Sequence, residues 1–145
     1  YYAVQDAFKR RAQRAARETK NYARGLGAED VPWSRGESVQ LTEFPDFYIG
    51  HVNEGLGTKN LIADDIESVT GRCYYDAIAQ TTVASIVNDL ITSGASPFSI
   101  HMHCAVGSVE WFEDVAMTKK LVTGWKEACR TFIRLLAGLT GISLV

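Results

Sequence analysis

Residues 53–59, which read Asn-Glu-Gly-Leu-Gly-Thr-Lys, combine residue types that can hold a phosphate group. Gly55 and Gly57 let the backbone turn sharply and approach a ligand closely. Backbone N–H groups in such a turn can hold an anion, and Lys59 adds a positive charge. A hairpin or loop turn with an exposed lysine fits the same seven residues, because short glycine motifs also occur without function. The motif therefore leaves two predictions open, a phosphate-binding loop and a plain turn.

Asp89 is the second residue with a predicted chemical role. It lies near the C-terminal end of an expected helix over 76–93, about five residues before Gly94. The helix dipole is negative there and disfavours a carboxylate by roughly 0.3–1 kcal/mol. No Lys or Arg lies within one helical turn to offset this effect. We therefore expect a cation from outside the helix to reach Asp89. An Asp that accepts hydrogen bonds from neighbouring backbone amides is the alternative.

Two histidines, His101 and His103, fall on one side of an alternating stretch. Apolar and small or polar residues alternate from 98 to 106, which predicts a strand with one polar face. Both histidines then point the same way and could bind a metal. Because no third ligand follows at a suitable spacing, we expect packing or hydrogen bonding instead. Cys104 faces the opposite side from His103, so a nucleophile–base pair is not expected.

The elements that position these residues follow from hydrophobic periodicity and from breakers such as Gly and Pro. The pattern predicts a helix over 3–24, a loop over 28–37, strands near 38–44 and 47–53, a connection over 60–72, helices over 76–93 and 110–137, and strands over 98–106 and from 142 onward. The acidic residues of the connection, Asp64, Asp65 and Glu67, lack calcium-loop spacing and are expected to be solvated. Together these elements predict an α+β fold, with a mixed four-stranded sheet packed on two long helices.

Positive charge is concentrated at the start of the chain. Residues 1–24 carry seven basic side chains against two acidic ones, so their net charge is +5 and the other residues sum to −7. Apolar residues line the other side of this expected helix. Nucleic acid is a conceivable partner for such a segment. No aromatic or glycine-rich pattern supports RNA or DNA binding, so we expect a solvated helix face and no nucleic-acid partner.

The composition of the 145 residues, with 46% hydrophobic and 22% charged residues, is that of an ordinary single globular domain. No apolar run approaches the roughly 20 residues of a membrane helix, so no membrane partner is expected. The three cysteines lack paired metal spacing and predict reduced thiols in a cytoplasmic protein. Between residues 73 and 109 only Asp76 and Asp89 carry a formal charge. We expect a ligand, another domain or a second subunit to cover this stretch.

Several short motifs follow one another in a defined order: Gly55–Lys59, Asp76, Val87–Leu90, Gly94–Pro97, and Ala105 with Gly107. Together with the expected order of strands and helices, they resemble the N-terminal domain of the aminoimidazole ribonucleotide (AIR) synthetase family, the phosphoribosylformylglycinamidine cyclo-ligases. The resemblance covers about residues 38–145 and implies the fold of that domain there. Residues 1–37 remain as an extra N-terminal basic helix and loop.

The resemblance implies an ATP-dependent ligase of purine biosynthesis that works as a cytoplasmic homodimer with Mg²⁺. In this family ATP activates the formyl oxygen of formylglycinamidine ribonucleotide as a phosphate ester. An internal amine then displaces phosphate to give aminoimidazole ribonucleotide, ADP and phosphate. Mg²⁺ bound to ATP becomes the first candidate for the cation at Asp89, and Lys59 the second. The implied site residues are Asp89 and Lys59 for catalysis, Gly55, Gly57, Thr58, Lys59 and Asn88 for the phosphates, and Asp89 and Glu54 for the metal.

The chain departs from the family pattern at several places. Glu54 stands where the family has Asp, which keeps the charge on a longer side chain. Met102 and His103 replace an Asp-Tyr pair, and the Gly-Gly-Glu-Thr segment and C-terminal domain expected after Val145 are absent. We therefore expect an inactive fragment of a longer enzyme. The alternatives are another ATP-dependent enzyme of the superfamily that phosphorylates a different substrate, and a non-catalytic dimerisation or binding module.

Overall fold

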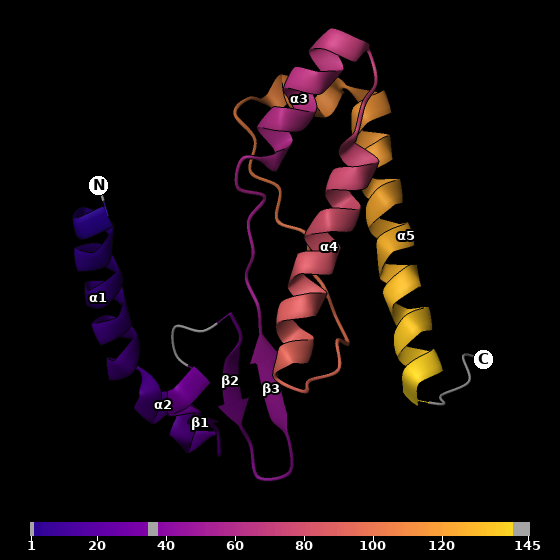
Figure 1. Ribbon diagram of the computed structural model, residues 1–145. Coiled ribbons are helices and arrows are strands. Elements are labelled where there is room, and N and C mark those ends of the chain that lie inside the picture. Colours follow the sequence, from indigo (N-terminus) through magenta and orange to yellow (C-terminus); the bar gives the residue numbers. More distant parts are fainter. Residues whose placement is uncertain (1, 35–37, 141–145) are drawn as a thin grey trace. The chain divides into compact units, whose positions relative to one another are not determined.

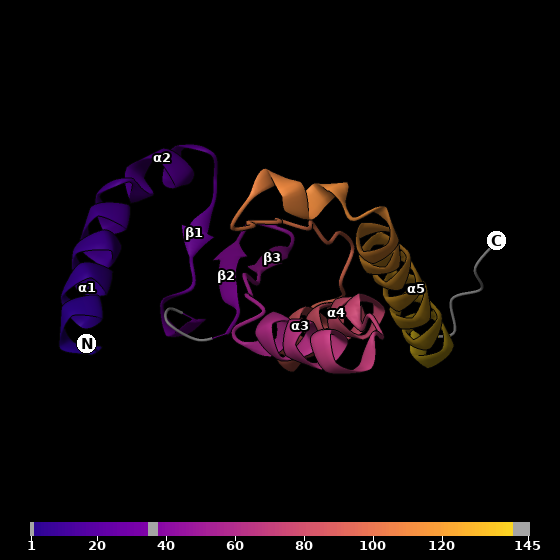
Figure 2. The same cartoon turned by 90° about the horizontal axis from the view of Figure 1, so that it is seen from above.

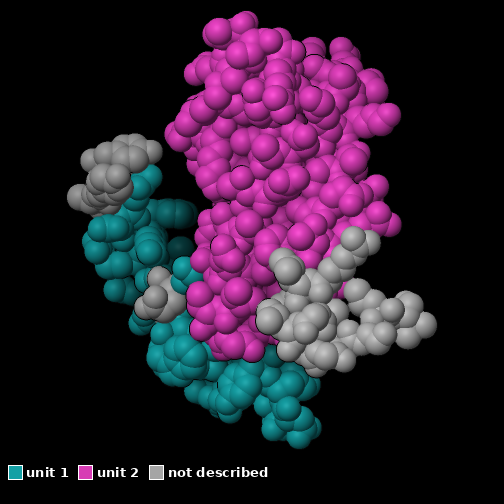
Figure 3. Space-filling model, turned by 45° about the vertical axis from the view of Figure 1, so that its right-hand side comes forward, with its two compact units in different colours: residues 1–51 teal, residues 52–145 magenta. Residues whose placement is uncertain are grey.

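The computed structural model describes residues 2–34 and 38–140 and divides the chain into two compact units, residues 1–51 and 52–145 (Figure 1, Figure 3). The strand expected from 142 onward lies outside the described residues. The sheet belongs to the first unit, and the two longest helices belong to the second. The expected packing of the sheet on the helices therefore stays a prediction.

Unit 1 begins with two helices. Helix α1 spans Tyr2–Glu18 and α2 spans Lys20–Gly25. The prediction of one uninterrupted helix over 3–24 is wrong, because the chain breaks at Thr19 between α1 and α2. The Thr19 hydroxyl donates to the Ala16 carbonyl oxygen at 2.7 Å. A hydroxyl that bonds back to the preceding turn competes with the helical backbone and bends a helix. The side chains of α1 from residue 5 onward are exposed apart from the half-buried Ala7. The basic side is therefore solvated as expected, but the apolar side with Phe8 is exposed as well.

Three antiparallel strands form the sheet of unit 1, in the order β1-β2-β3. Strand β1 spans Glu29–Asp30, β2 spans Gln40–Glu43 and β3 spans Tyr48–His51, with the 3-10 turn η1 at Pro32–Ser34. Strands β2 and β3 confirm the two strands expected near 38–44 and 47–53. They form a hairpin closed by the Phe44 N–H, which donates to the Phe47 carbonyl oxygen at 2.8 Å. Strands joined by so short a turn pair antiparallel. The sheet of the described residues is three-stranded and antiparallel, so the prediction of a four-stranded mixed sheet is not confirmed.

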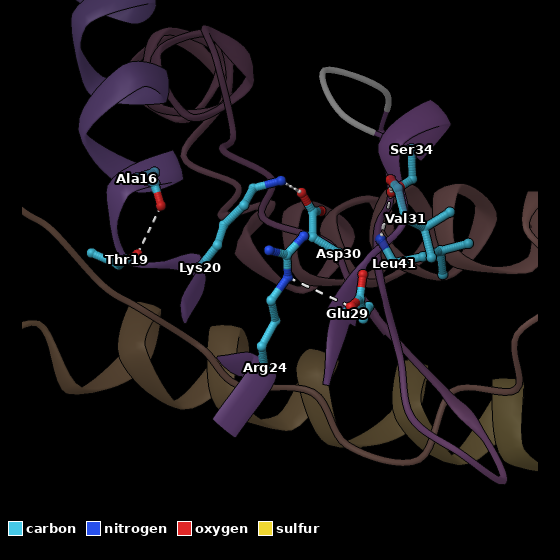
Figure 4. Close-up of polar contacts among 9 residues, drawn as sticks. All are labelled: Ala16, Thr19, Lys20, Arg24, Glu29, Asp30, Val31, Ser34 and Leu41. Carbon is cyan, nitrogen blue, oxygen red and sulfur yellow. Dashed lines mark hydrogen bonds and ion pairs between the residues drawn. The ribbon is translucent and has the colours of Figure 1, made fainter. Parts of the chain in front are cut away.

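Ser34 and an ion pair hold the parts of unit 1 together (Figure 4). Ser34 is fully buried; its hydroxyl donates to the Val31 carbonyl oxygen at 2.8 Å and accepts from the Leu41 N–H at 2.9 Å. Lys20 Nζ lies 2.9 Å from Asp30 Oδ2. The serine therefore links η1 to β2, and the ion pair links α2 to β1.

Unit 2 is built on two long helices that lie side by side and run in the same direction (Figure 1, Figure 2). Helix α4 spans Tyr75–Thr92, and α5 spans Val115–Thr140 after the 3-10 turn η2 at Val109–Glu113. Helix α3, Lys59–Thr70, lies on the other side of α4 from α5. No helix in the described part of the chain is both long and apolar enough to cross a membrane. The buried core of α4 and α5 consists of Tyr75, Ala79, Val83, Val87, Met117, Leu121 and Ala128.

The bounds of α4 agree with the helix expected over 76–93 to within one residue. Gly94, at φ 77°, takes the left-handed conformation after the last turn, as its type predicts. Asp76 lies in the first turn instead of at the expected N-cap, which is Tyr74. The helix begins one residue earlier because Tyr75 packs into the core with Ala79.

Unit 2 differs from the sequence-based expectation in several places, and one of them is the end of α5, which lies at Thr140 instead of the expected residue 137. The expected connection over 60–72 is helix α3, in which only Ala63 is buried, so its apolar residues form no core-facing stripe to reveal it. The stretch 98–106 pairs with no strand in the described residues, since alternation predicts an extended backbone but supplies no neighbouring strand. The helix expected over 110–137 begins at Val115, because the Asp114 carboxylate accepts the Met117 N–H at 2.9 Å and caps the new helix.

Candidate functional site

A cavity of about 830 Å³ lies in unit 2. The glycine turn, residues 53–58 before α3, forms one wall, and the stretch 101–107 forms another. Side chains of α3 and α4 complete the wall beside the turn, and Trp111, Leu121 and Trp125 contribute a largely aromatic wall. Every lining residue lies between 52 and 125, so the cavity belongs to unit 2 alone.

The glycine turn leads directly into the N-terminus of α3. Gly57 has φ 60°, a left-handed conformation that favours glycine, and α3 begins two residues later at Lys59. The Thr58 side chain makes no cap hydrogen bond, and the Lys59 N–H donates to the Leu56 carbonyl oxygen at 3.3 Å, so the N–H groups of Asn60 and Leu61 are the ones that this end of α3 offers to a ligand. Two first-turn residues, Asn60 and Leu61, line the cavity. A helix N-terminus attracts anions, so this wall is suited to a phosphate group.

The left-handed conformation of Gly57 gives the first testable prediction. Gly57→Ala is expected to lower the free energy of unfolding by about 1 kcal/mol, because an L-residue is strained at this φ. Gly55→Ala is the matched control, since Gly55 has equally open surroundings but no positive φ. The midpoints of urea denaturation compare the two variants. Equal midpoints would show that the turn does not depend on the left-handed conformation.

Asp64 and Tyr75 form a hydrogen-bonded pair on the cavity wall. Tyr75 is 3% exposed, and its hydroxyl donates to Asp64 Oδ1 at 2.8 Å. The tyrosine ring packs edge-on against Trp111, with ring centroids 5.9 Å apart. Burial, and after it the hydrogen bond to Asp64, raises the pKa of Tyr75 to about 12. The phenol therefore stays protonated at neutral pH and keeps its proton directed at the Asp64 carboxylate.

The charged side chains of the cavity are negative. Glu54 and Asp64 line it, together with His101 and His103, whereas no Lys or Arg of the described residues does so. Among residues 2–34 and 38–140, no group of three or more His, Cys, Asp or Glu side chains is placed to hold a metal ion. A metal in this unit would therefore take part of its ligand set from a bound molecule or from water. All three cysteines are free thiols.

The structure brings only some of the expected site residues to this cavity. Glu54, Gly55 and Gly57 line it. The other four, Thr58, Lys59, Asn88 and Asp89, are not among its lining residues. Asp89 is half-buried near the C-terminal end of α4 and has no ion-pair partner in the described part of the chain. It therefore stays a prediction that these two groups of residues bind the same magnesium-ATP.

Three residues of the cavity wall, Asp64, Tyr75 and Trp111, were not expected there from the sequence. Asp64 is expected in a solvated connection, and its bond to Tyr75 exists only because that connection is a helix. Trp111 is expected only as part of a core stripe. A usable signal was the spacing of Asn60 and Asp64, which places both on one side of a helix that starts after the glycine turn.

The sequence was compared with known proteins. The sequence model of one protein family, the AIR synthase related protein N-terminal domain, matches residues 54–142. Phosphoribosylformylglycinamidine cyclo-ligase of Pyrococcus furiosus is 34% identical over 116 residues, which are 79% of this chain and 32% of that protein. The enzyme of the same name from Pyrococcus horikoshii shows the same identity and coverage. That from Desulfotalea psychrophila is 32% identical over 93 residues, 64% of this chain and 23% of that protein.

The chain spans about a third of the length of the two Pyrococcus proteins. No solved structure matches it significantly. The family match begins at Glu54, so it takes in most of the glycine turn, α3, α4 and the cavity wall formed by 101–107. Helix α1 and the sheet of unit 1 lie before the matched residues.

Proposed function

The chain belongs to the AIR synthase related protein family through its N-terminal domain, and from this premise we propose that it forms the nucleotide-binding part of an ATP-dependent phosphoribosylformylglycinamidine cyclo-ligase of purine biosynthesis. The observation that carries the proposal is the glycine turn, which leads into an uncapped helix N-terminus on the wall of a large cavity. Backbone N–H groups and the helix dipole favour phosphate at such a place. The relatives that share this segment are named cyclo-ligases.

In the proposed reaction, the terminal phosphoryl group of ATP is transferred to the formyl oxygen of formylglycinamidine ribonucleotide. An internal amine nitrogen then bonds to the formyl carbon and gives up a proton, the carbon–oxygen bond breaks, and phosphate leaves as the imidazole ring closes. The backbone N–H groups of Gly55, Gly57 and Thr58 hold the phosphates, with Lys59 and Asn88 as further contacts. Phosphoryl transfer depends mainly on positioning and on charge stabilisation, which these groups can supply.

Glu54 and Asp89 are the carboxylates that we propose for magnesium. Glu54 lines the cavity and Asp89 is half-buried on α4, and both provide hard oxygen ligands. Mg²⁺ is commonly held by one or two carboxylates together with substrate phosphates and water, so a set of three protein ligands is not needed. Bound there, magnesium would neutralise charge that develops on the transferred phosphoryl group, and Glu54 and Asp89 would hold it in place.

A different phosphoryl acceptor is the second candidate function. Met102 and His103 line the cavity, and they stand where the family pattern has an Asp-Tyr pair. A panel of acceptors incubated with magnesium-ATP and the complete protein that carries these residues separates the two candidates. We expect ADP release to depend on formylglycinamidine ribonucleotide. ADP release with another acceptor alone would favour the second candidate, and no nucleotide binding at all would favour a non-catalytic module.

We also propose a cytoplasmic homodimer in which the stretch 73–109 contributes to the interface. That stretch holds only two formal charges, and Phe98 within it is 88% exposed. Sedimentation at micromolar concentration is expected to give twice the mass of the chain, and Phe98→Glu is expected to give a monomer. Val69→Glu is the matched control, because Val69 is also exposed but lies on α3, outside the stretch. A wild-type monomer would contradict the prediction.

A further inference from the structure

Asp64 has no role in the proposed binding of ATP, yet the structure holds its carboxylate in a defined position. Its Oδ1 accepts the Tyr75 hydroxyl at 2.8 Å, and Tyr75 is anchored in the core beside Met117 and Leu121. Asp64 itself is exposed and lines the cavity. One oxygen is therefore fixed from the protein side, while the rest of the carboxylate can accept hydrogen bonds from a ligand.

The surroundings of Asp64 favour a planar cation. Glu54 is the other carboxylate of the cavity, and no Lys or Arg among its lining residues neutralises the pair. Trp111 and Trp125 also line the cavity. Indole rings attract cations to their faces, so the aromatic wall adds to the attraction of the cavity for a positively charged group. A group with two N–H donors in one plane pairs best with a carboxylate, as guanidinium groups do.

The cyclo-ligase relatives are named after formylglycinamidine, a compound that carries an amidine group. An amidine is protonated at neutral pH, and its two nitrogens present parallel N–H donors. We infer that Asp64 recognises the amidinium group of the substrate, with Tyr75 as the residue that positions the carboxylate. This inference rests on the proposed function and adds a specificity-determining residue to it.

Asp64 fits this role better than Glu54 does. Glu54 lies in the glycine turn, where the phosphates and magnesium are proposed to bind, and it has no hydrogen-bond partner among the described residues that would hold it. Asp64 is fixed by a buried hydroxyl that stays protonated at neutral pH. A carboxylate that is already oriented loses less conformational freedom when the ligand binds. Asp64 is thus the better prepared partner for a cation.

The test uses a pair of ligands that differ in this one group: the amidine substrate and the corresponding amide, which is uncharged. Calorimetry on the complete protein measures the Kd of each. We expect wild type to prefer the amidine. Asp64→Asn is expected to weaken amidine binding about ten- to a hundredfold, the usual effect of losing a hydrogen bond to a charged group, and to leave amide binding unchanged. Asparagine can still accept the Tyr75 hydroxyl, so the fold is preserved.

Two further variants control the result. Asp65→Asn removes the adjacent exposed carboxylate of α3, which does not line the cavity, and is expected to leave the preference for the amidine intact. Tyr75→Phe keeps the ring and removes the hydroxyl, so it is expected to weaken amidine binding less than Asp64→Asn does. Melting temperatures show whether each variant is folded.

The outcomes separate the inference from the proposed function. If wild type prefers the amidine and Asp64→Asn retains that preference, the inference is overturned and the proposed function stands. Loss of the preference in Glu54→Gln, but not in Asp64→Asn, would assign recognition to Glu54 and would also overturn it. If wild type binds neither ligand and no nucleotide, the proposed function fails and the inference fails with it.

Discussion

Replacing Gly124 with alanine is expected to lower the free energy of unfolding by about 2–3 kcal/mol, the scale of an overpacked core. A Cβ at this position would lie 2.7 Å from both the Cα and the carbonyl oxygen of Asp76, which are backbone atoms of α4. Backbone atoms cannot turn aside as a flexible side chain can, so α4 and α5 must move apart. In an exposed helix the same substitution is usually stabilising by up to about 1 kcal/mol. A loss of stability in Gly124→Ala, in place of a gain, therefore indicates that Gly124 packs closely against the backbone of α4.

Urea denaturation followed by tryptophan fluorescence is a suitable measurement, because Trp111 and Trp125 pack against this core. Gly25→Ala is the matched control: Gly25 ends α2, has no atom within 4 Å of an added Cβ and has no positive φ. We expect the control to unfold at or slightly above the wild-type midpoint. A Gly124→Ala midpoint equal to that of wild type would mean that α4 and α5 do not approach as closely as described.

Replacing Asp89 with asparagine is expected to lower ATP turnover of the complete protein by at least about a hundredfold, the scale seen when one key electrostatic group is lost. Asp89 is half-buried near the C-terminal end of α4, and no cation pairs with it among the described residues. The helix dipole disfavours a carboxylate at this end. Loss of the charge is therefore expected to leave the ligand-free fold unchanged or slightly more stable, while magnesium-ATP loses a ligand.

Asp76→Asn is the control on the same helix. Asp76 lies in the first turn of α4, where the dipole favours a carboxylate, and it accepts the Ala77 N–H at 3.0 Å. This variant is expected to lose roughly 0.3–1 kcal/mol of stability and to keep near-normal turnover. For Asp89→Asn, near-normal turnover with a large fall in melting temperature would show a structural role, and the assigned magnesium ligand would be wrong.

Much of the local structure could be predicted from the sequence because it depends on nearby residues. Gly94 marks the end of α4, and Pro45 with Asp46 separates β2 from β3, so these bounds follow from local backbone preferences. The glycine motif was likewise predicted as a turn, and Gly57 takes φ 60° within it. Local patterns did not predict that a helix follows this turn, because α3 buries only Ala63 and has no apolar stripe that packs on a core.

The cavity depends on contacts between residues that are distant in the sequence. Asp64 meets Tyr75 only because α3 folds against the start of α4, and Gly124 meets Asp76 only because α5 lies beside α4. No periodicity encodes these pairs. The stretch 98–106 illustrates the converse: its alternation predicts an extended chain, and the absence of a paired strand in the described residues depends on what lies beside it. Pattern reasoning therefore identified the phosphate-binding candidate but not the part of the wall formed by Asp64, Tyr75 and Trp111.

The proposed activation of a formyl oxygen by phosphorylation is tested most directly by the fate of that oxygen. Formylglycinamidine ribonucleotide labelled with ¹⁸O at the formyl group is incubated with magnesium-ATP and the complete protein, and the released phosphate is analysed by mass spectrometry. The account predicts one ¹⁸O atom in the phosphate for each aminoimidazole ribonucleotide formed, because the carbon–oxygen bond breaks with phosphate as the leaving group. Product formed with unlabelled phosphate, or ATP hydrolysis without ring closure, would contradict it.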